Sequence, residues 1–106
     1  MNGWNIQTVN ANGTSASDAT IISRDSPWTV ALVNIDASNV AVQLPVDGVI
    51  VGDLVEVCTN STSPTNTTVW IGTTVLNSST SNFDSIGAGR SRFFRYVSGS
   101  IWTKYD

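Results

Sequence analysis

The sequence WTVALVNI, residues Trp28–Ile35, decides the fold class. It is dense in the apolar and β-branched residues that favour strands, and Pro27 stands at its start. A second run of the same kind, LVEVCT at Leu54–Thr59, opens after the turn signal Gly52-Asp53. Both runs are short, as strands are, and both therefore predict β-structure.

Further strand-like runs follow the same pattern. They are Val40–Leu44, ended by Pro45; the short runs Val69–Gly72 and Thr74–Leu76; and Arg92–Val97 with Ile101–Tyr105, which predict a closing hairpin around Ser98-Gly99. No 11-residue window shows the 3.6-residue apolar period of a helix. We therefore expect an all-β domain at residues 27–106, a small antiparallel β-sandwich or barrel of about seven to nine short strands.

The first 26 residues are more polar. A short strand at Trp4–Val9 is one interpretation, and Asn12–Ser15 predicts a turn. We expect residues 1–26 to form an extended N-terminal arm or an edge strand with little core of its own.

Composition excludes several classes of protein. The chain has 106 residues, among them 14 Ser, 13 Thr and 10 Asn, with a net charge of −3 and five basic residues. A nucleic-acid binder needs a basic surface, so no nucleic acid is expected as a partner. No apolar run is long enough to span a membrane, and the start of the chain lacks the features of a signal peptide. The one cysteine, Cys58, cannot form an intrachain disulfide, which favours folding in a reducing cytoplasm.

The sequence offers few of the residue combinations that enzymes use for catalysis. The chain has no histidine, so its serines lack the commonest base partner, and Cys58 is expected to be a small buried side chain. Asp47, Asp53 and Glu56 could share a calcium ion, but turn and strand-end roles are favoured because their spacing matches no calcium loop. We expect no catalytic residue, no metal and no cofactor.

Candidate binding residues are aromatic and basic. Trp4, Ile6 and Val9 could anchor the arm on a partner, because tryptophan is enriched at binding hot spots, although Trp4 folding back onto its own domain is an equal alternative. Trp28, Arg90, Arg92 and Arg95 are candidates for a subunit or partner interface; alternation places Arg92 and Arg95 on opposite faces, and a solvated surface is the alternative. Trp70 and Trp102 are assigned to the core.

From Val30 onward the chain resembles small β modules of tailed-phage structural proteins. The residues that carry the resemblance are Val40–Pro45, Val51–Val57, the apolar strand at Val69–Ile71, and Phe93–Val97 leading into Ser98–Trp102. Together they span about 75 residues. The resemblance implies a non-catalytic, trimeric module. Without a fibre shaft, the chain is most similar to a head decoration (cement) protein.

A decoration protein is expected on the outer capsid surface of the virion, after synthesis in the host cytoplasm. Its partners would be the major capsid protein and two further copies of itself, and it would stabilise the head by bridging capsomers. The alternative is a tail-fibre or baseplate module that binds a host receptor or carbohydrate, with Trp70 near the loop Asn60–Thr68 as the stacking residue. A β-sandwich binding domain unrelated to phages is the third interpretation.

Overall fold

The computed structural model describes residues 4–60, 66–70, 75–76, 83–98 and 101–105. Within these residues the chain is entirely β-structure and turns, so no helix there could span a membrane. The ten strands are β1 (Trp4–Asn10), β2 (Thr20–Ile21), β3 (Trp28–Asn34), β4 (Ala41–Gln43), β5 (Leu54–Thr59), β6 (Thr67–Trp70), β7 (Val75–Leu76), β8 (Phe83–Ile86), β9 (Ser91–Ser98) and β10 (Ile101–Tyr105).

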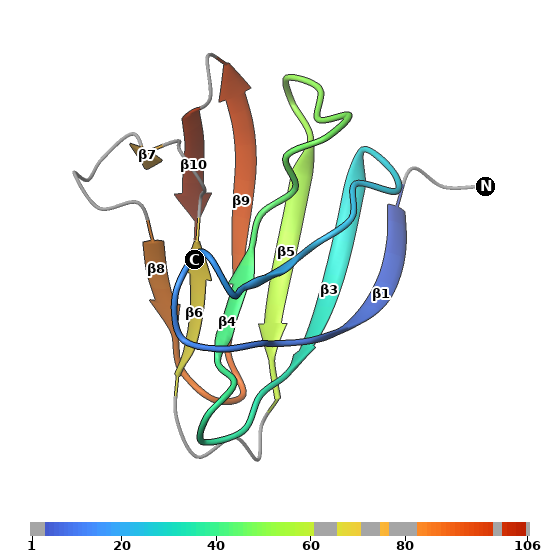
Figure 1. Cartoon of the computed structure of the whole chain (residues 1–106). Helices are drawn as coiled ribbons and strands as arrows, with labels where there is room; N and C mark the ends of the chain where they lie inside the picture. The colour runs from blue at the N-terminus through green and yellow to red at the C-terminus, as the bar shows by residue number, and fades with distance from the viewer. Residues whose placement is uncertain (1–3, 61–65, 71–74, 77–82, 99–100, 106) are drawn as a thin grey trace.

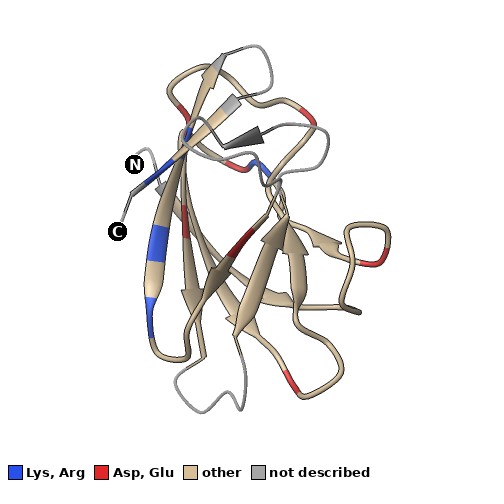
Figure 2. Ribbon diagram, turned by 90° about the vertical axis from the view of Figure 1, so that its left-hand side faces the viewer, with Lys and Arg blue, Asp and Glu red and all other residues tan. Residues whose placement is uncertain are grey.

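The strands form two sheets that face each other (Figures 1 and 2). The larger, sheet A, has the order β1-β3-β5-β9-β10-β7, and the smaller, sheet B, has the order β2-β4-β6-β8. The all-β, sandwich-like prediction is confirmed, and the sheets do not close into a barrel.

The prediction of antiparallel strands is wrong for most of the described molecule. Five of the eight strand pairings are parallel, and only β5–β9, β9–β10 and β6–β8 are antiparallel. The reason is the path of the chain, which alternates between the sheets from β1 to β6. Each strand therefore pairs with the next strand but one, which runs in the same direction. In a sequence, short connections rich in turn residues usually indicate hairpins between neighbouring antiparallel strands. Here the connections between β1 and β6 instead cross from one sheet to the other.

Strand positions were predicted better than strand directions. The run Leu54–Thr59 coincides with β5, and Trp28–Ile35 extends one residue beyond β3. The closing hairpin of β9 and β10 is confirmed, although its predicted turn at Gly99 lies outside the described residues. Strands β2 and β8 were not predicted, because each is short and lies in a polar stretch.

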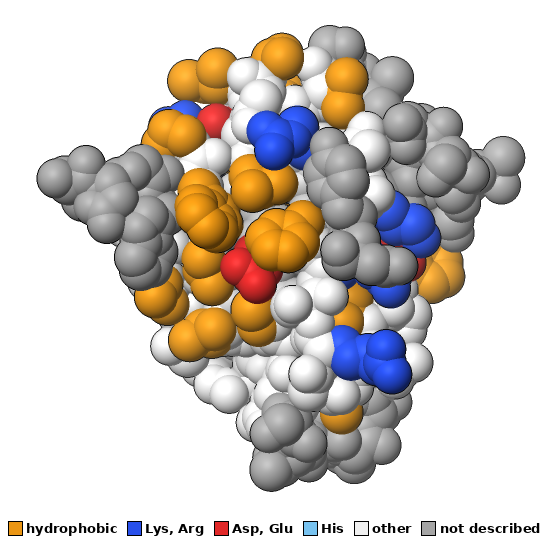
Figure 3. All heavy atoms as spheres, turned by 180° about the vertical axis from the view of Figure 1, so that it is seen from behind, with side chains coloured by type: hydrophobic (Ala, Val, Ile, Leu, Met, Phe, Trp, Pro, Cys, Tyr) orange, Lys and Arg blue, Asp and Glu red, His pale blue; other side chains and the backbone are white. Residues whose placement is uncertain are grey.

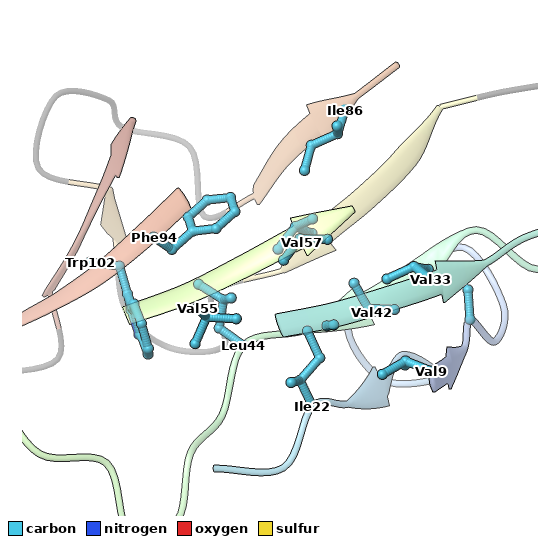
Figure 4. Packing of buried hydrophobic residues seen from close by; sticks show 13 residues of the cluster. Val9, Ile22, Val33, Val42, Leu44, Val55, Val57, Ile86, Phe94 and Trp102 are labelled. Carbon is cyan, nitrogen blue, oxygen red and sulfur yellow. The ribbon is translucent and has the colours of Figure 1, made fainter. Parts of the chain in front are cut away.

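The core lies between the two sheets (Figure 4). Val55, Val57 and Phe94 face inward from sheet A, while Val42 and Val69 face them from sheet B. Strict alternation makes this possible, since every second residue of a strand points to the same side. Trp102 is 2% exposed, which confirms its assignment to the core.

A buried carboxylate also links the sheets. Asp84 of β8 accepts hydrogen bonds from Arg92 of β9 and from Lys104 Nζ of β10, the latter at 3.0 Å. Burial raises the pKa of Asp84, but these two cations outweigh it and hold the pKa below its usual range. An ion pair at this position joins the antiparallel strands of sheet A to the edge of sheet B.

Candidate protein-binding surface

The side of sheet A that faces away from the core is rich in apolar side chains. We name it the outer face. Its described residues include Ile6, Thr8, Trp28, Val30, Leu32, Leu54, Glu56, Cys58, Phe93, Arg95 and Val97. Ile6 is 51% exposed, Leu32 43%, Val97 41% and Trp28 39%. Monomeric soluble proteins rarely leave an apolar patch of such extent uncovered, so the outer face is the leading candidate for a binding surface.

Strand register arranges these side chains in rows. One row runs through Trp28, Leu54 and Arg95, and a second through Ile6, Val30, Glu56 and Phe93. Figure 3, which views this side of the molecule, shows the hydrophobic side chains gathered over much of it. Because the rows cross four neighbouring strands, the surface is continuous rather than a set of isolated side chains.

Two charged residues lie among the apolar ones. Glu56 projects from β5 between Val30 and Phe93, and Arg95 projects from the next strand, β9. Arg95 is exposed, and its Nη1 donates to the carbonyl oxygen of Gly52 at 2.9 Å. The outer face therefore carries one negative and one positive group.

Cys58 also belongs to the outer face. It is half-buried rather than fully buried as predicted. Odd and even positions of β5 point to opposite sides, and Cys58 has the parity of Glu56. Burial raises the pKa of Cys58 to about 11, and Glu56 adds to this through its charge and through a hydrogen bond. Such a thiol is a poor nucleophile at neutral pH.

The structure separates the three residues predicted as the anchor of an arm. β1 pairs with β3 along its whole length, from Trp4 to Asn10, as the edge strand of sheet A. Ile6 points outward, whereas Val9 is 4% exposed and packs in the core. The side chain of Trp4 lies outside the described residues. Of the two whose side chains are described, Ile6 is therefore the one that a partner could reach.

The four residues predicted at a subunit or partner interface are also divided. Trp28 and Arg95 lie on the outer face, and the predicted opposition of Arg92 and Arg95 is confirmed, since Arg92 points inward to Asp84. Arg90 is exposed in the turn before β9. Figure 2 shows how basic positions follow this part of the chain while acidic ones are scattered.

Sequence reasoning missed the apolar members of the outer face, which are Val30, Leu32, Leu54, Phe93 and Val97. A signal was present. In WTVALVNI, apolar residues occupy positions of both parities, so one set of them must point away from the core. Runs that are apolar at both parities are typical of strands covered on both faces of their sheet.

The three acidic residues considered for calcium lie in different surroundings. Asp53 is buried and accepts hydrogen bonds from Arg24 and from the backbone N–H of Ile50. Asp47 lies exposed in a turn, and Glu56 lies on the outer face. The strand-end role predicted for Asp53 is confirmed.

Sheet B has a smaller outward row. Register aligns Ile21, Gln43, Trp70 and Phe83 across its four strands. The rings of Trp70 and Phe83 lie 4.9 Å apart at 42°, and Phe83 is 41% exposed. Trp70 is thus partly exposed on the outside of sheet B, and its assignment to the core is wrong.

Comparisons with known proteins support the fold alone. No protein-family model and no curated protein matches the chain. A solved structure described as a chaperone–substrate complex is similar at 22% sequence identity and a TM-score of 0.55, over 93% of this chain. The present chain spans only 17% of that structure's chain, so the similarity identifies a β module that also occurs within a much longer protein.

Proposed function

We propose that this protein is a structural component of a bacteriophage particle: a head decoration protein that binds the outer capsid surface as a homotrimer and stabilises the head by bridging capsomers. The observation that carries the proposal is the outer face of sheet A. An exposed apolar surface four strands wide is a surface for packing against protein. The resemblance of Val40–Pro45 and Val51–Val57 to phage β modules supplies the biological setting.

A binding role without catalysis agrees with the pKa shifts of the cysteine and of the buried carboxylates. Cys58 has a raised pKa, the opposite of what an activated nucleophile requires. Asp53 and Asp84, the two buried carboxylates among the described residues, are engaged by cations and have lowered pKa values. A general acid or base working near pH 7 needs the reverse shift.

The mechanism is geometric. A trimer on a local threefold axis presents three equivalent sites to the surrounding capsid subunits. Weak contacts at the three sites combine through multivalency, and a trimer attached to adjacent capsomers resists their separation. The N-terminal arm expected at residues 1–26 is not a free attachment to the capsid in this scheme, because Val9, Ala11 and Ile22 belong to the core. Removing residues 1–20 would therefore remove core side chains such as Val9 and Ala11.

The experiment is co-sedimentation with heads of the phage that encodes the chain, prepared without it. We expect saturable binding at a fixed ratio to the capsid protein, and a solution mass of three times 11.3 kDa. Absence of binding to such heads would overturn the proposal.

A matched pair of variants tests the role of the outer face. Ile6 on β1 and Ile21 on β2 are exposed to 51% and 52%, and each lies on the edge strand of its sheet. Ile6→Ser is expected to weaken assembly or head binding, and Ile21→Ser to leave both unchanged. The opposite ranking would move the binding surface to sheet B.

The second candidate function, receptor or carbohydrate binding by a tail module, is favoured by the outward row of sheet B. Aromatic rings such as Trp70 and Phe83 stack on sugars, and the amide of Gln43 in the same row offers hydrogen bonds. Binding to host glycans that is lost in Phe83→Ala, in a protein that ignores heads, would establish this function instead.

A further inference from the structure

We propose that the outer face of sheet A packs against the outer faces of further copies of this chain around a threefold axis, with Glu56 of each copy paired with Arg95 of the next. This deepens the proposed function, on which it rests, by naming the surface through which the copies assemble. It assigns the apolar face to self-association and leaves other surfaces for the capsid.

Charge is the first argument. Glu56 lies between Val30 and Phe93, so any partner that covers these apolar side chains also covers its carboxylate. Covering a carboxylate without a cation is costly, and the cost falls when a guanidinium forms hydrogen bonds to it. Arg95 supplies such a guanidinium from the same face, so the face is complementary to itself.

The position of the two residues permits a symmetric arrangement. Leu54 pairs with Arg95 and Glu56 pairs with Phe93, so Glu56 and Arg95 are diagonal neighbours on adjacent strands. In a closed symmetric assembly each contact is repeated by every copy. Each carboxylate then receives the guanidinium of another copy, and no charged group of the face is covered alone.

Area is the second argument. At about 4.8 Å between strands and about 3.3 Å per residue, a seven-residue length of four strands measures about 19 × 23 Å. Projecting side chains make its accessible area larger than this flat area, and a standard interface needs about 800 Å² from each partner. Nearly the whole face must therefore be covered. In a trimer whose three outer faces are turned toward the axis, the two neighbouring copies cover each face together.

The test is a charge-reversal cycle on the full-length protein. Self-association of wild type, Glu56→Arg, Arg95→Glu and the double variant is measured without heads by analytical ultracentrifugation over a range of concentrations. We expect each single reversal to weaken association at least about tenfold, because it places like charges opposite each other. The double reversal restores opposite charges and is expected to recover most of the loss.

Two features of the design separate pairing from damage to the fold. Arg95 donates to the Gly52 carbonyl oxygen, a bond that the double variant also lacks, so its recovery cannot come from that bond. Asp47→Arg and Arg90→Glu make the same charge changes at exposed residues off the face and are expected to leave association unchanged. Alkylation of Cys58 gives a second readout, since assembly at high concentration is expected to protect this thiol of the outer face.

A monomer at all concentrations, or an oligomer indifferent to both single reversals, would overturn the inference. Failure of the double variant to recover association would also overturn it. Head binding, measured separately, distinguishes the two proposals. Self-association that follows the cycle in a protein that ignores heads supports the inference and overturns the decoration role. Head binding by a monomer that Glu56→Arg abolishes supports the decoration role and assigns the outer face to the capsid protein.

Discussion

Arg24 donates two hydrogen bonds to Asp53, from Nε to Oδ2 at 2.8 Å and from Nη2 to Oδ1 at 2.9 Å. Arg24 follows β2 of sheet B, and Asp53 directly precedes β5 at the centre of sheet A. The Asp53 carboxylate also accepts the backbone N–H of Ile50 at 2.8 Å. Two parallel bonds between a planar guanidinium and a carboxylate fix orientation as well as distance. The pair therefore joins the two sheets at the N-terminal end of β5.

We predict that Asp53→Asn lowers the free energy of unfolding by about 2 kcal/mol, because the substitution removes the charge and one acceptor from a buried hydrogen-bonded site. Urea unfolding at pH 7, followed by tryptophan fluorescence, measures the change. Asp47→Asn, at an exposed turn, is the control and is expected to stay within about 0.5 kcal/mol of wild type. Equal losses in both variants would contradict a specific role for the pair with Arg24.

Stability is expected to depend on pH in the acid range. Burial raises the pKa of Asp53 and of Asp84, but the cations and the N–H group that contact them outweigh burial, so both pKa values lie below the usual 3.8. A carboxyl group with a lowered pKa in the folded state adds stability above its unfolded pKa and loses it as the pH falls through its folded pKa.

We therefore predict a nearly constant free energy of unfolding from about pH 7 to pH 5 and a steep decrease below about pH 4. Urea unfolding across this range measures it. The decrease is expected to be shallower in Asp53→Asn and in Asp84→Asn, since each variant lacks one of the titrating groups. An unchanged slope in both would show that other groups control acid unfolding.

The sequence predicted strands well because their signal is local. Alternation and β-branched residues mark β3 and β5 without reference to the rest of the chain. Whether neighbouring strands run parallel or antiparallel could not be predicted from such local patterns. Whether a polar turn such as Asp36–Asn39 reverses the chain within one sheet or carries it to the other depends on which strand edge is free, and that is a property of the assembled fold.

Only part of the candidate binding surface could be predicted from the sequence, because strand register is also a property of the assembled fold. Trp28 and Arg95 were identified as individual residues, but the surface arises from register, which sets Leu54 of β5 between them. Arg92 and Arg95 are three residues apart on one strand, so their side chains point to opposite sides of the sheet. Once Arg95 is known to point outward, Arg92 must point inward. That Asp84 is the partner of Arg92 could not be predicted, because the sequence did not indicate strand β8.

We predict that Cys58 is slow to alkylate in the folded protein. With a pKa of about 11, its thiolate is scarce at pH 8, so iodoacetamide is expected to react about 100-fold more slowly than with the urea-unfolded chain. Glu56→Gln removes the negative charge that helps to raise the pKa and is expected to speed the reaction. Equal rates in the folded and unfolded states would show that neither burial nor Glu56 acts on the thiol.

Trp28 and Trp102 lie on opposite sides of sheet A, and substitutions at the two positions separate stability from binding. Trp102 is 2% exposed, and its ring centroid lies 5.2 Å from that of Tyr96, so Trp102→Ala leaves a large cavity in the core. A loss of about 3–5 kcal/mol in the free energy of unfolding is expected. Trp28 is 39% exposed on the outer face, where Trp28→Ala creates no core cavity and is expected to cost less than about 1 kcal/mol.

For self-association we expect Trp28→Ala to have the larger effect of the two tryptophan substitutions. Trp28→Ala removes the largest described aromatic group of the outer face and is expected to weaken self-association about tenfold or more, as hot-spot tryptophans do. Urea unfolding under monomeric conditions and sedimentation over a concentration series supply the two measurements. A Trp28 variant that loses stability as a monomer but associates normally would mean that this side of sheet A supports the fold rather than a partner.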